Sequence, residues 1–392
     1  MDRSFDFILA GIALIRGIAY AGYCIVFLFA VYTFEKSIPD QIYVKAGEAI
    51  DYQFQVPVTM EIQEDSSPVA KSTNNANVRQ SYIVTCRLFG IFPVKDIEVV
   101  LVDGDAVYAG GMPIGIYVKT RGVLVIGTSE VERPDGSEAA PAENILKAGD
   151  YILSVNGEKV AEKEDLQRLV QQNGAEKEIL KINRKGEEVE VGVTPVQNKN
   201  GTYMLGAWVR DDLAGIGTLT YYKEDGTYGA LGHAVSDGDV GERIQMREGY
   251  VYNAQIIGVK KGQKGNPGEL SGMIRYQSAD CLGTIEENTD IGIYGKLDGN
   301  IAALPRGDYY NICYKQDIKQ GPATIICGFT GEKKEYAIEI ESLDYSGREA
   351  NKGILFRVTD EQLLDMTGGI VQGMSGSPIL QDGKIIGAVT HV

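Results

Sequence analysis

A short glycine-rich stretch near the C-terminus, GMSGS at residues 373–377, has the residue types that acyl transfer needs. A serine between glycines in a tight loop can expose its hydroxyl while neighbouring backbone N–H groups converge on one point. We therefore predict that Ser375 is a nucleophile and that the N–H groups of Gly373 and Ser375 stabilise an oxyanion. Hairpin turns without chemistry are also rich in glycine and serine, so the prediction depends on a partner base.

A serine nucleophile needs a base, and the chain has only two histidines, His233 and His391. His233 follows a glycine where a short apolar segment enters a polar turn, so its ring can face a cleft. We predict that His233 takes the serine proton. A carboxylate should orient the imidazole. The sequence leaves four candidates open for this role: Asp237, Asp239, Asp360 and Asp365.

The composition limits the class of protein. The chain has 392 residues, with 38 Lys+Arg against 54 Asp+Glu, and a net charge of −16. This acidic balance disfavours a nucleic-acid partner, because phosphate binding needs a basic face. The 48 glycines and 22 tyrosines favour a turn-rich, mainly β protein. The five cysteines have no metal-binding spacing and are interpreted as small buried hydrophobic residues. A serine nucleophile with a histidine base needs no metal or organic cofactor, so none is expected.

An uncharged apolar run precedes the rest of the chain. Residues 17–34 contain no charged side chain, and about 20 apolar residues span a bilayer as a helix. We expect a single-pass membrane anchor in residues 1–36, with the N-terminus cytoplasmic because Arg3 and Arg16 precede the run. A cleavable signal peptide is the alternative, but no A-x-A site follows the apolar core.

The remainder reads as three regions. Residues 37–100 are rich in Val, Ile, Tyr and Thr and are predicted to form a β-rich extracytoplasmic region. Residues 101–197 combine glycine-punctuated strands with KEDLQRLVQQNG at 163–174, which has the apolar spacing of an amphipathic helix. Residues 198–392 carry many short strands and frequent turns, typical of a barrel or a pair of barrels.

The second region resembles a PDZ domain, an α+β fold, most clearly in PAENILKAGDYILSVNGEKV at residues 141–160. Such domains add an extended peptide or a protein C-terminus to a sheet edge, and a glycine-containing loop presents N–H groups to the terminal carboxylate. We expect binding of this kind at 101–197. The loop residues predicted to do so are Gly111, Met112, Ile114 and Gly115.

Several segments occur in an order similar to that of the SpoIVB peptidase family, the stage IV sporulation protein B of endospore-forming bacteria. After the PDZ-like segment come ALGHAVSDGD, KGNPGEL, LGTIEENTDIGIYGKL and GGIVQGMSGSPI, followed by GKIIGAVTHV. The resemblance covers most of residues 80–392. It implies a membrane-tethered serine endopeptidase with a chymotrypsin-like double β-barrel over 198–392. It also implies that Ser375 is the nucleophile, His233 the base and Asp360 the acid.

The strand that follows the nucleophile motif resembles the wall of a chymotrypsin-like specificity pocket, so we expect His391 to line that pocket. Family members usually continue beyond AVTHV, so the end at Val392 leads us to expect a truncated C-terminus.

The resemblance further implies a signalling role in the space between forespore and mother cell. Family members cleave a regulatory membrane protein, which leads to processing of the sigma-K precursor, and they cleave themselves between anchor and PDZ domain. We expect self-cleavage between Glu64 and Asn77, and a forespore-membrane location with an extracytoplasmic catalytic part. Two alternatives remain: an envelope quality-control PDZ protease and a catalytically inactive PDZ adaptor.

Overall fold

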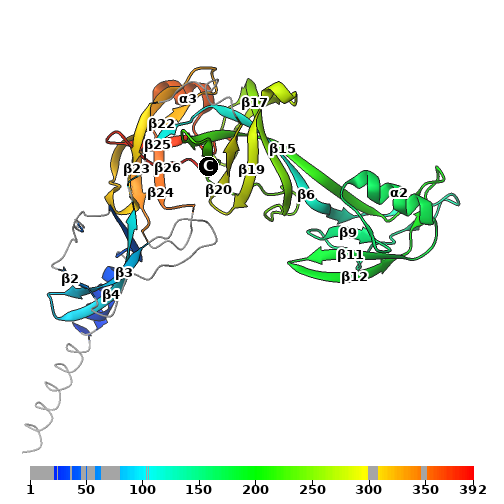
Figure 1. Cartoon of the computed structure of the whole chain (residues 1–392), viewed down its shortest axis with the longest axis horizontal. Helices are drawn as coiled ribbons and strands as arrows, with labels where there is room; N and C mark the ends of the chain where they lie inside the picture. The colour runs from blue at the N-terminus through cyan, green and yellow to red at the C-terminus, as the bar shows by residue number, and fades with distance from the viewer. Residues whose placement is uncertain are drawn as a thin grey trace, which may run out of the picture. The chain divides into compact units, whose positions relative to one another are not determined.

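The chain is mainly β, as the composition predicts (Figure 1). The computed structural model describes residues 22–23, 25–35, 38–45, 50, 58–62, 80–102, 104, 106–298, 308–345 and 351–392. These residues divide into two compact units. The first contains Met1–Ala106, Asn311–Gly321 and Ile340–Phe356, and the second contains Val107–Tyr310, Pro322–Glu339 and Arg357–Val392.

The predicted membrane anchor in residues 1–36 falls largely outside the described residues. Residues 25–35 are helical. Among the residues that the structure describes, no helix has both the length and the apolar character needed to cross a membrane. The expected self-cleavage region between Glu64 and Asn77 also lies outside the described residues.

The first unit contains a four-stranded sheet in the order β1-β4-β3-β2, in which β1 is parallel to β4 and the other neighbours are antiparallel. Its strands are β1 Gln41–Lys45, β2 Val58–Ile62, β3 Ser81–Leu88 and β4 Phe92–Val102. Alternating apolar residues place Ile42, Val84, Cys86 and Val99 in one buried cluster. This alternation is what a sheet with one packed face requires.

Most strands after residue 105, which lie largely in the second unit, belong to one hydrogen-bonded network that closes on itself. Its first members are β5 Ala106–Ala109, β6 Pro113–Thr128, β9 Tyr151–Val155, β10 Glu158–Lys159, β11 Glu178–Arg184, β12 Glu187–Val193, β15 Ala207–Tyr222, β16 Thr227–Ala230, β17 Met246–Lys260 and β18 Glu269–Ile274. The later members are β19 Cys281–Thr289, β20 Gly292–Leu297, β21 Tyr309–Ile312, β22 Gly321–Cys327, β23 Lys334–Leu343, β24 Ile354–Val358, β25 Pro378–Gln381 and β26 Lys384–Ala388.

Two long antiparallel strands, β6 and β15, join the two parts of this unit (Figure 1). At one end β6 also pairs with β17, where Tyr117 lies opposite Tyr250. The other end of β6 and β15 lies in the sheet of β9, β11 and β12. β5 and the first half of β6 lie within the range 101–197 expected for the PDZ-like region, but they pair with β15 and β17. Two segments of the expected peptidase region group with the first unit, namely Asn311–Gly321 and Ile340–Phe356.

The PDZ part has its own core. Helix α2, Lys163–Asn173, begins at Glu162 with a capping box to Asp165 and buries Leu166, Leu169 and Val170, as the sequence pattern predicts. The remaining short elements are β7 Val131–Glu132, β8 Glu138–Ala139, β13 Val196–Gln197, β14 Tyr203–Met204 and the 3-10 turns Ser278–Asp280 and Lys315–Asp317.

Candidate active site

The loop that carries Ser375 connects helix α3, Glu361–Thr367, to strand β25. The Ser375 carbonyl accepts a hydrogen bond from the Thr218 N–H at 2.9 Å, and the Gly376 N–H donates to the Val389 carbonyl at 2.8 Å. Gly376 has a φ of +99°, and a Cβ placed there would lie 2.1 Å from the Thr218 carbonyl oxygen. Only glycine fits this position, so the motif is fixed between β15 and the segment after β26.

Two N–H groups of this loop are free to bind a ligand. In the part of the chain that the structure describes, the N–H groups of Gly373 and Ser375 donate no hydrogen bond. The N–H groups of their neighbours donate within the protein, namely those of Gln372, Met374, Gly376 and Ser377. Selective exposure of these two donors is what an oxyanion hole requires.

His233 follows two residues with positive φ, Leu231 at 72° and Gly232 at 76°. Its Nδ1 lies 2.8 Å from the carbonyl oxygen of Ala234. Because a carbonyl can only accept, Nδ1 carries the proton in this contact and Nε2 is left unprotonated in the neutral ring. The tautomer is therefore the one that a general base needs.

Ser375 and His233 line the same cleft, which has a volume of about 470 Å³ and also includes Gly373 and His391. The Ser375 hydroxyl donates to the Thr390 carbonyl at 3.1 Å. Within the described residues no hydrogen bond joins Ser375 to His233. Catalytic hydrogen bonds are often formed only when substrate binds, so this geometry is compatible with a serine–histidine pair.

His391 lines this cleft as well. Its ring centroid is 6.0 Å from that of His233. Its Nδ1 lies 2.9 Å from the Thr390 Oγ1.

The predicted acid, Asp360, does not line the cleft. It is the N-cap of α3, where its carboxylate oxygens accept the N–H groups of Leu363 at 3.0 Å and Ala337 at 3.4 Å. Within the described residues, it makes no hydrogen bond to His233. The structure therefore does not bring Asp360 to the imidazole: one oxygen caps α3 and the other accepts from Ala337 of β23.

The other carboxylate candidates are also used elsewhere. Asp237 is buried and accepts hydrogen bonds from Arg210 and from the N–H groups of Asp239 and Val240. Asp239 itself lies 3.2 Å from Arg210. Asp365 is exposed on α3. In the described structure, the His233 imidazole is oriented by a main-chain carbonyl.

Comparison with known families agrees with the geometry of this cleft. The family model described as SpoIVB peptidase S55 matches residues 201–392, the range that contains His233, Asp360 and Ser375. The chain belongs to the SpoIVB peptidase family. A PDZ domain model matches residues 134–184. The chain is therefore a sporulation serine peptidase that carries a PDZ domain. A search of curated proteins gave no match.

The structure places the loop that was predicted to bind a carboxylate outside the matched PDZ range. Gly111 and Met112 directly precede β6, and Ile114 and Gly115 belong to it. The Gly111 N–H donates to the Leu219 carbonyl at 2.7 Å, and the Ile114 side chain is buried in the core cluster. The Gly111 N–H and the Ile114 side chain are therefore committed to packing in the peptidase part.

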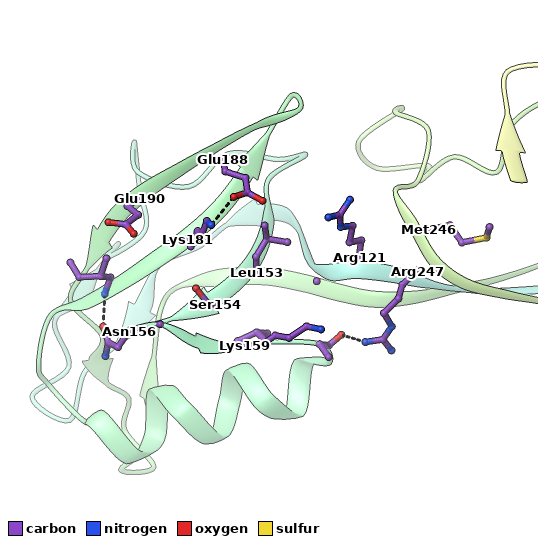
Figure 2. Close-up of a pocket in the computed structure, with 15 residues that line it drawn as sticks. Arg121, Leu153, Ser154, Asn156, Lys159, Lys181, Glu188, Glu190, Met246 and Arg247 are labelled. Atoms are coloured by element: carbon purple, nitrogen blue, oxygen red, sulfur yellow. Dashed lines mark hydrogen bonds and ion pairs between the residues drawn. The ribbon is translucent and has the colours of Figure 1, made fainter. Parts of the chain in front are cut away.

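A larger hollow, of about 1100 Å³, lies beside the PDZ sheet and shares no lining residue with the cleft at Ser375. Figure 2 shows the Lys181–Glu188 ion pair, at 2.6 Å, on its wall. Arg247 of β17 borders the hollow and donates to the Ala161 carbonyl at 3.3 Å (Figure 2). The hollow is thus enclosed by both the PDZ part and the start of β17.

Proposed function

We propose that this SpoIVB peptidase is a membrane-tethered signalling endopeptidase whose catalytic pair is Ser375 and His233. The observation that carries the proposal is the single cleft that contains both side chains and the two free N–H groups of Gly373 and Ser375. The family match over residues 201–392 supports the peptidase, and the uncharged run at residues 17–34 supports the anchor.

In this reaction the Ser375 hydroxyl turns from the Thr390 carbonyl towards His233. Nε2 of His233 removes the hydroxyl proton while Oγ bonds to the carbonyl carbon of the substrate peptide. The N–H groups of Gly373 and Ser375 hold the resulting oxyanion. The protonated imidazole then gives its proton to the leaving amine, and water hydrolyses the acyl-enzyme by the same steps.

The role of Asp360 rests on the family motif, because its described contacts are those of a helix cap. To act as the triad acid, its carboxylate has to leave these N–H groups in the working enzyme.

We further infer the biological setting from the family. The proposed location is the forespore membrane, with the catalytic part in the space between forespore and mother cell. The proposed substrates are a regulatory membrane protein of the sigma-K processing complex and the chain itself, between Glu64 and Asn77. These assignments rest on the family to which the chain belongs.

Self-processing tests the proposal directly. The full chain and its Ser375→Ala variant are expressed side by side, and their sizes are followed by immunoblotting. Ser377→Ala is the matched control, because this buried serine belongs to the same motif but does not line the cleft. We expect shortening of the parent and the control only. Equal processing of all three chains would refute Ser375 as the nucleophile.

The two alternatives make different predictions in the same preparation. An envelope quality-control protease would degrade denatured casein broadly, whereas a signalling enzyme would leave most of it intact. A PDZ adaptor would cleave neither itself nor casein but would still bind a peptide.

We infer that the PDZ peptide enters the hollow of Figure 2. Arg121 and Lys159 line it and form no ion pair with any residue that the structure describes. Leu153, Ile179 and Met246 add apolar surface. Two free cations beside apolar side chains suit a C-terminal carboxylate or an acidic side chain on an extended peptide.

The corresponding test is peptide affinity in the Arg121→Glu variant. We expect weaker binding of a peptide with a free C-terminus, with Lys185→Glu, at an exposed hairpin turn, as the control. Unchanged affinity in Arg121→Glu would place the peptide elsewhere.

A further inference from the structure

The hairpin of β17 and β18 exposes apolar side chains beside the nucleophile loop. Ile257 is 68% exposed, Met273 50% and Val259 36%. Met273 lies opposite Gln255, whereas Val259 lies opposite the buried Leu270, so Met273 and Val259 point to different faces of one antiparallel hairpin. Ile257 and Met273 are the more exposed, and because folded proteins seldom leave large apolar surface in water, they indicate an interaction.

The tip of the same hairpin is basic. Lys260, Lys261 and Lys264 are exposed and form no ion pair among the residues that the structure describes. Residues 255–275 contain these lysines, Arg275 and one acid, Glu269, which gives 4 − 1 = +3. The whole chain carries −16. The hairpin is therefore a local positive patch on an acidic protein.

An exposed tyrosine follows the hairpin. Tyr276, directly after β18, is 53% exposed and packs edge-on against Tyr252 and Tyr117, with ring centroids 5.3 and 5.6 Å apart. Tyrosine, with an apolar ring and a polar hydroxyl, is enriched where protein meets the headgroup region of a bilayer.

We propose that this hairpin docks onto an anionic lipid surface. Ile257 and Met273 enter the interface, and the tip lysines contact lipid phosphates. Interfacial binding combines buried apolar area with attraction to anionic lipids, and this hairpin supplies both. The acidic remainder of the chain is repelled by such a surface, which fixes the orientation. A symmetric contact between two copies would oppose lysines to lysines, so a second copy fits less well.

The docked hairpin would place the catalytic cleft beside the lipid. Pro267 in the hairpin loop lines the cleft together with Ser375. The Leu270 N–H donates to the Gln372 carbonyl at 2.8 Å, and Leu270 packs against Gly373. Peptide bonds close to the membrane surface would therefore reach Ser375 most easily. This inference does not depend on the membrane anchor or on the proposed substrates.

A single tryptophan in the hairpin tests the proposal in the full chain. Trp208, in β15, is the only tryptophan of the sequence. The hairpin variant, W208F/M273W, is reconstituted into phosphatidylglycerol–phosphatidylcholine vesicles or pure phosphatidylcholine vesicles, both with brominated acyl chains. The matched control variant is W208F/I291W, because Ile291 is 48% exposed between β19 and β20. Flotation of the chain with the vesicles measures membrane association through the N-terminal anchor, independently of the hairpin fluorescence.

We expect bromolipid quenching of the hairpin variant's fluorescence in the anionic vesicles, a loss of this quenching in pure phosphatidylcholine, and no quenching of the control variant. Adding K260Q/K261Q/K264Q to the hairpin variant should abolish the quenching, whereas K147Q/K177Q/K185Q, three exposed PDZ lysines, should not. Far-UV circular dichroism checks that each variant folds.

Three other results would overturn the proposal. If the hairpin variant is unquenched in both kinds of vesicle, the hairpin does not bind lipid, and a protein partner would be its occupant instead. Equal quenching of the hairpin and control variants would mean that the hairpin does not orient the chain. A hairpin-variant emission that shifts to the blue with protein concentration, in detergent without vesicles, would show that a second copy covers the patch.

Discussion

The guanidinium of Arg210 donates a hydrogen bond to the carboxylate of Asp237, in the loop that follows His233. The Asp237 side chain is fully buried and also accepts the N–H groups of Asp239 at 2.8 Å and Val240 at 3.0 Å. Arg210 belongs to β15, where it lies opposite Leu124 of β6 at the edge of the PDZ sheet. The pair therefore ties the PDZ strands to the loop that positions the imidazole.

Removing the arginine should disable this loop. Arg210→Gln leaves the buried Asp237 charge without its partner, which typically costs about 3–5 kcal/mol. We expect a lower Tm and a lower kcat for peptide cleavage, both largely restored in Arg210→Gln/Asp237→Asn. Thermal unfolding and peptide hydrolysis measure the two effects.

The control for this prediction is Arg243→Gln in the same loop. Its ion pair with Asp290, at 3.0 Å, is exposed on both sides and should contribute at most about 1 kcal/mol. If Arg210→Gln behaved like Arg243→Gln, the proposed link between the PDZ strands and His233 would not exist.

Local patterns predicted the local features of this chain well. Helix α2 has the bounds and the buried residues Leu166, Leu169 and Val170 that its amphipathic spacing indicates. Ser375 and His233 share a cleft, although they are far apart in the sequence. In both cases the prediction uses residues that are neighbours in the sequence. The spacing of apolar residues indicates the buried face of a helix, and glycines indicate a tight turn with positive φ.

Features that depend on long-range pairing were not predictable. The glycine loop at residues 111–115 has the composition of a PDZ loop, but β6 continues through it into the peptidase strands. The Ser375 hydroxyl and the His233 ring contact the main-chain carbonyls of Thr390 and Ala234. Every residue type has a main-chain carbonyl, so residue types could not predict these contacts. The Arg210–Asp237 ion pair likewise could not be predicted, because it depends on the pairing of β15 with β6, which places Arg210 near the loop after His233.

The Asp360→Ser variant separates the two roles of this carboxylate. A serine side chain can cap α3, so stability should change by only a few tenths of a kcal/mol. It cannot orient an imidazole, so if Asp360 is the triad acid, kcat should fall about 10⁴-fold. Asp365→Asn, on the exposed side of α3, is the control. Full activity of Asp360→Ser would show that Asp360 is only a helix cap.

His391 should affect the choice of cleavage site more than the rate. It lines the cleft next to Ser375 but makes no hydrogen bond to it within the described residues. We expect His391→Ala to keep Ser375-dependent cleavage and to change the preferred residues around the scissile bond, measured by mass spectrometry of a digested peptide library. An unchanged preference would exclude His391 from the specificity pocket.

A buried carboxylate in the PDZ part should make stability depend on pH. The Glu178 side chain is buried, and the amides of Asn156 and Asn173 donate to its Oε2 at 2.6 and 3.0 Å. Its Oε1 has no hydrogen-bond partner among the described residues. Burial raises the pKa of Glu178 above its ordinary value of 4.5, and the two amides only partly oppose this.

Because the folded-state pKa is raised, the folded chain holds this proton more tightly than the unfolded chain does. The associated stability is present below pH 4.5 and is lost as the pH rises through the folded-state pKa. Glu178→Gln has no charge to bury, and its amide oxygen can still accept from both asparagines. We therefore expect it to unfold about 2–4 °C higher than the parent at pH 8 and at a similar temperature at pH 4. The exposed Glu176→Gln variant controls for the loss of a negative charge. A Glu178→Gln advantage that is the same at both pH values would mean that packing, rather than the buried charge, separates the two proteins.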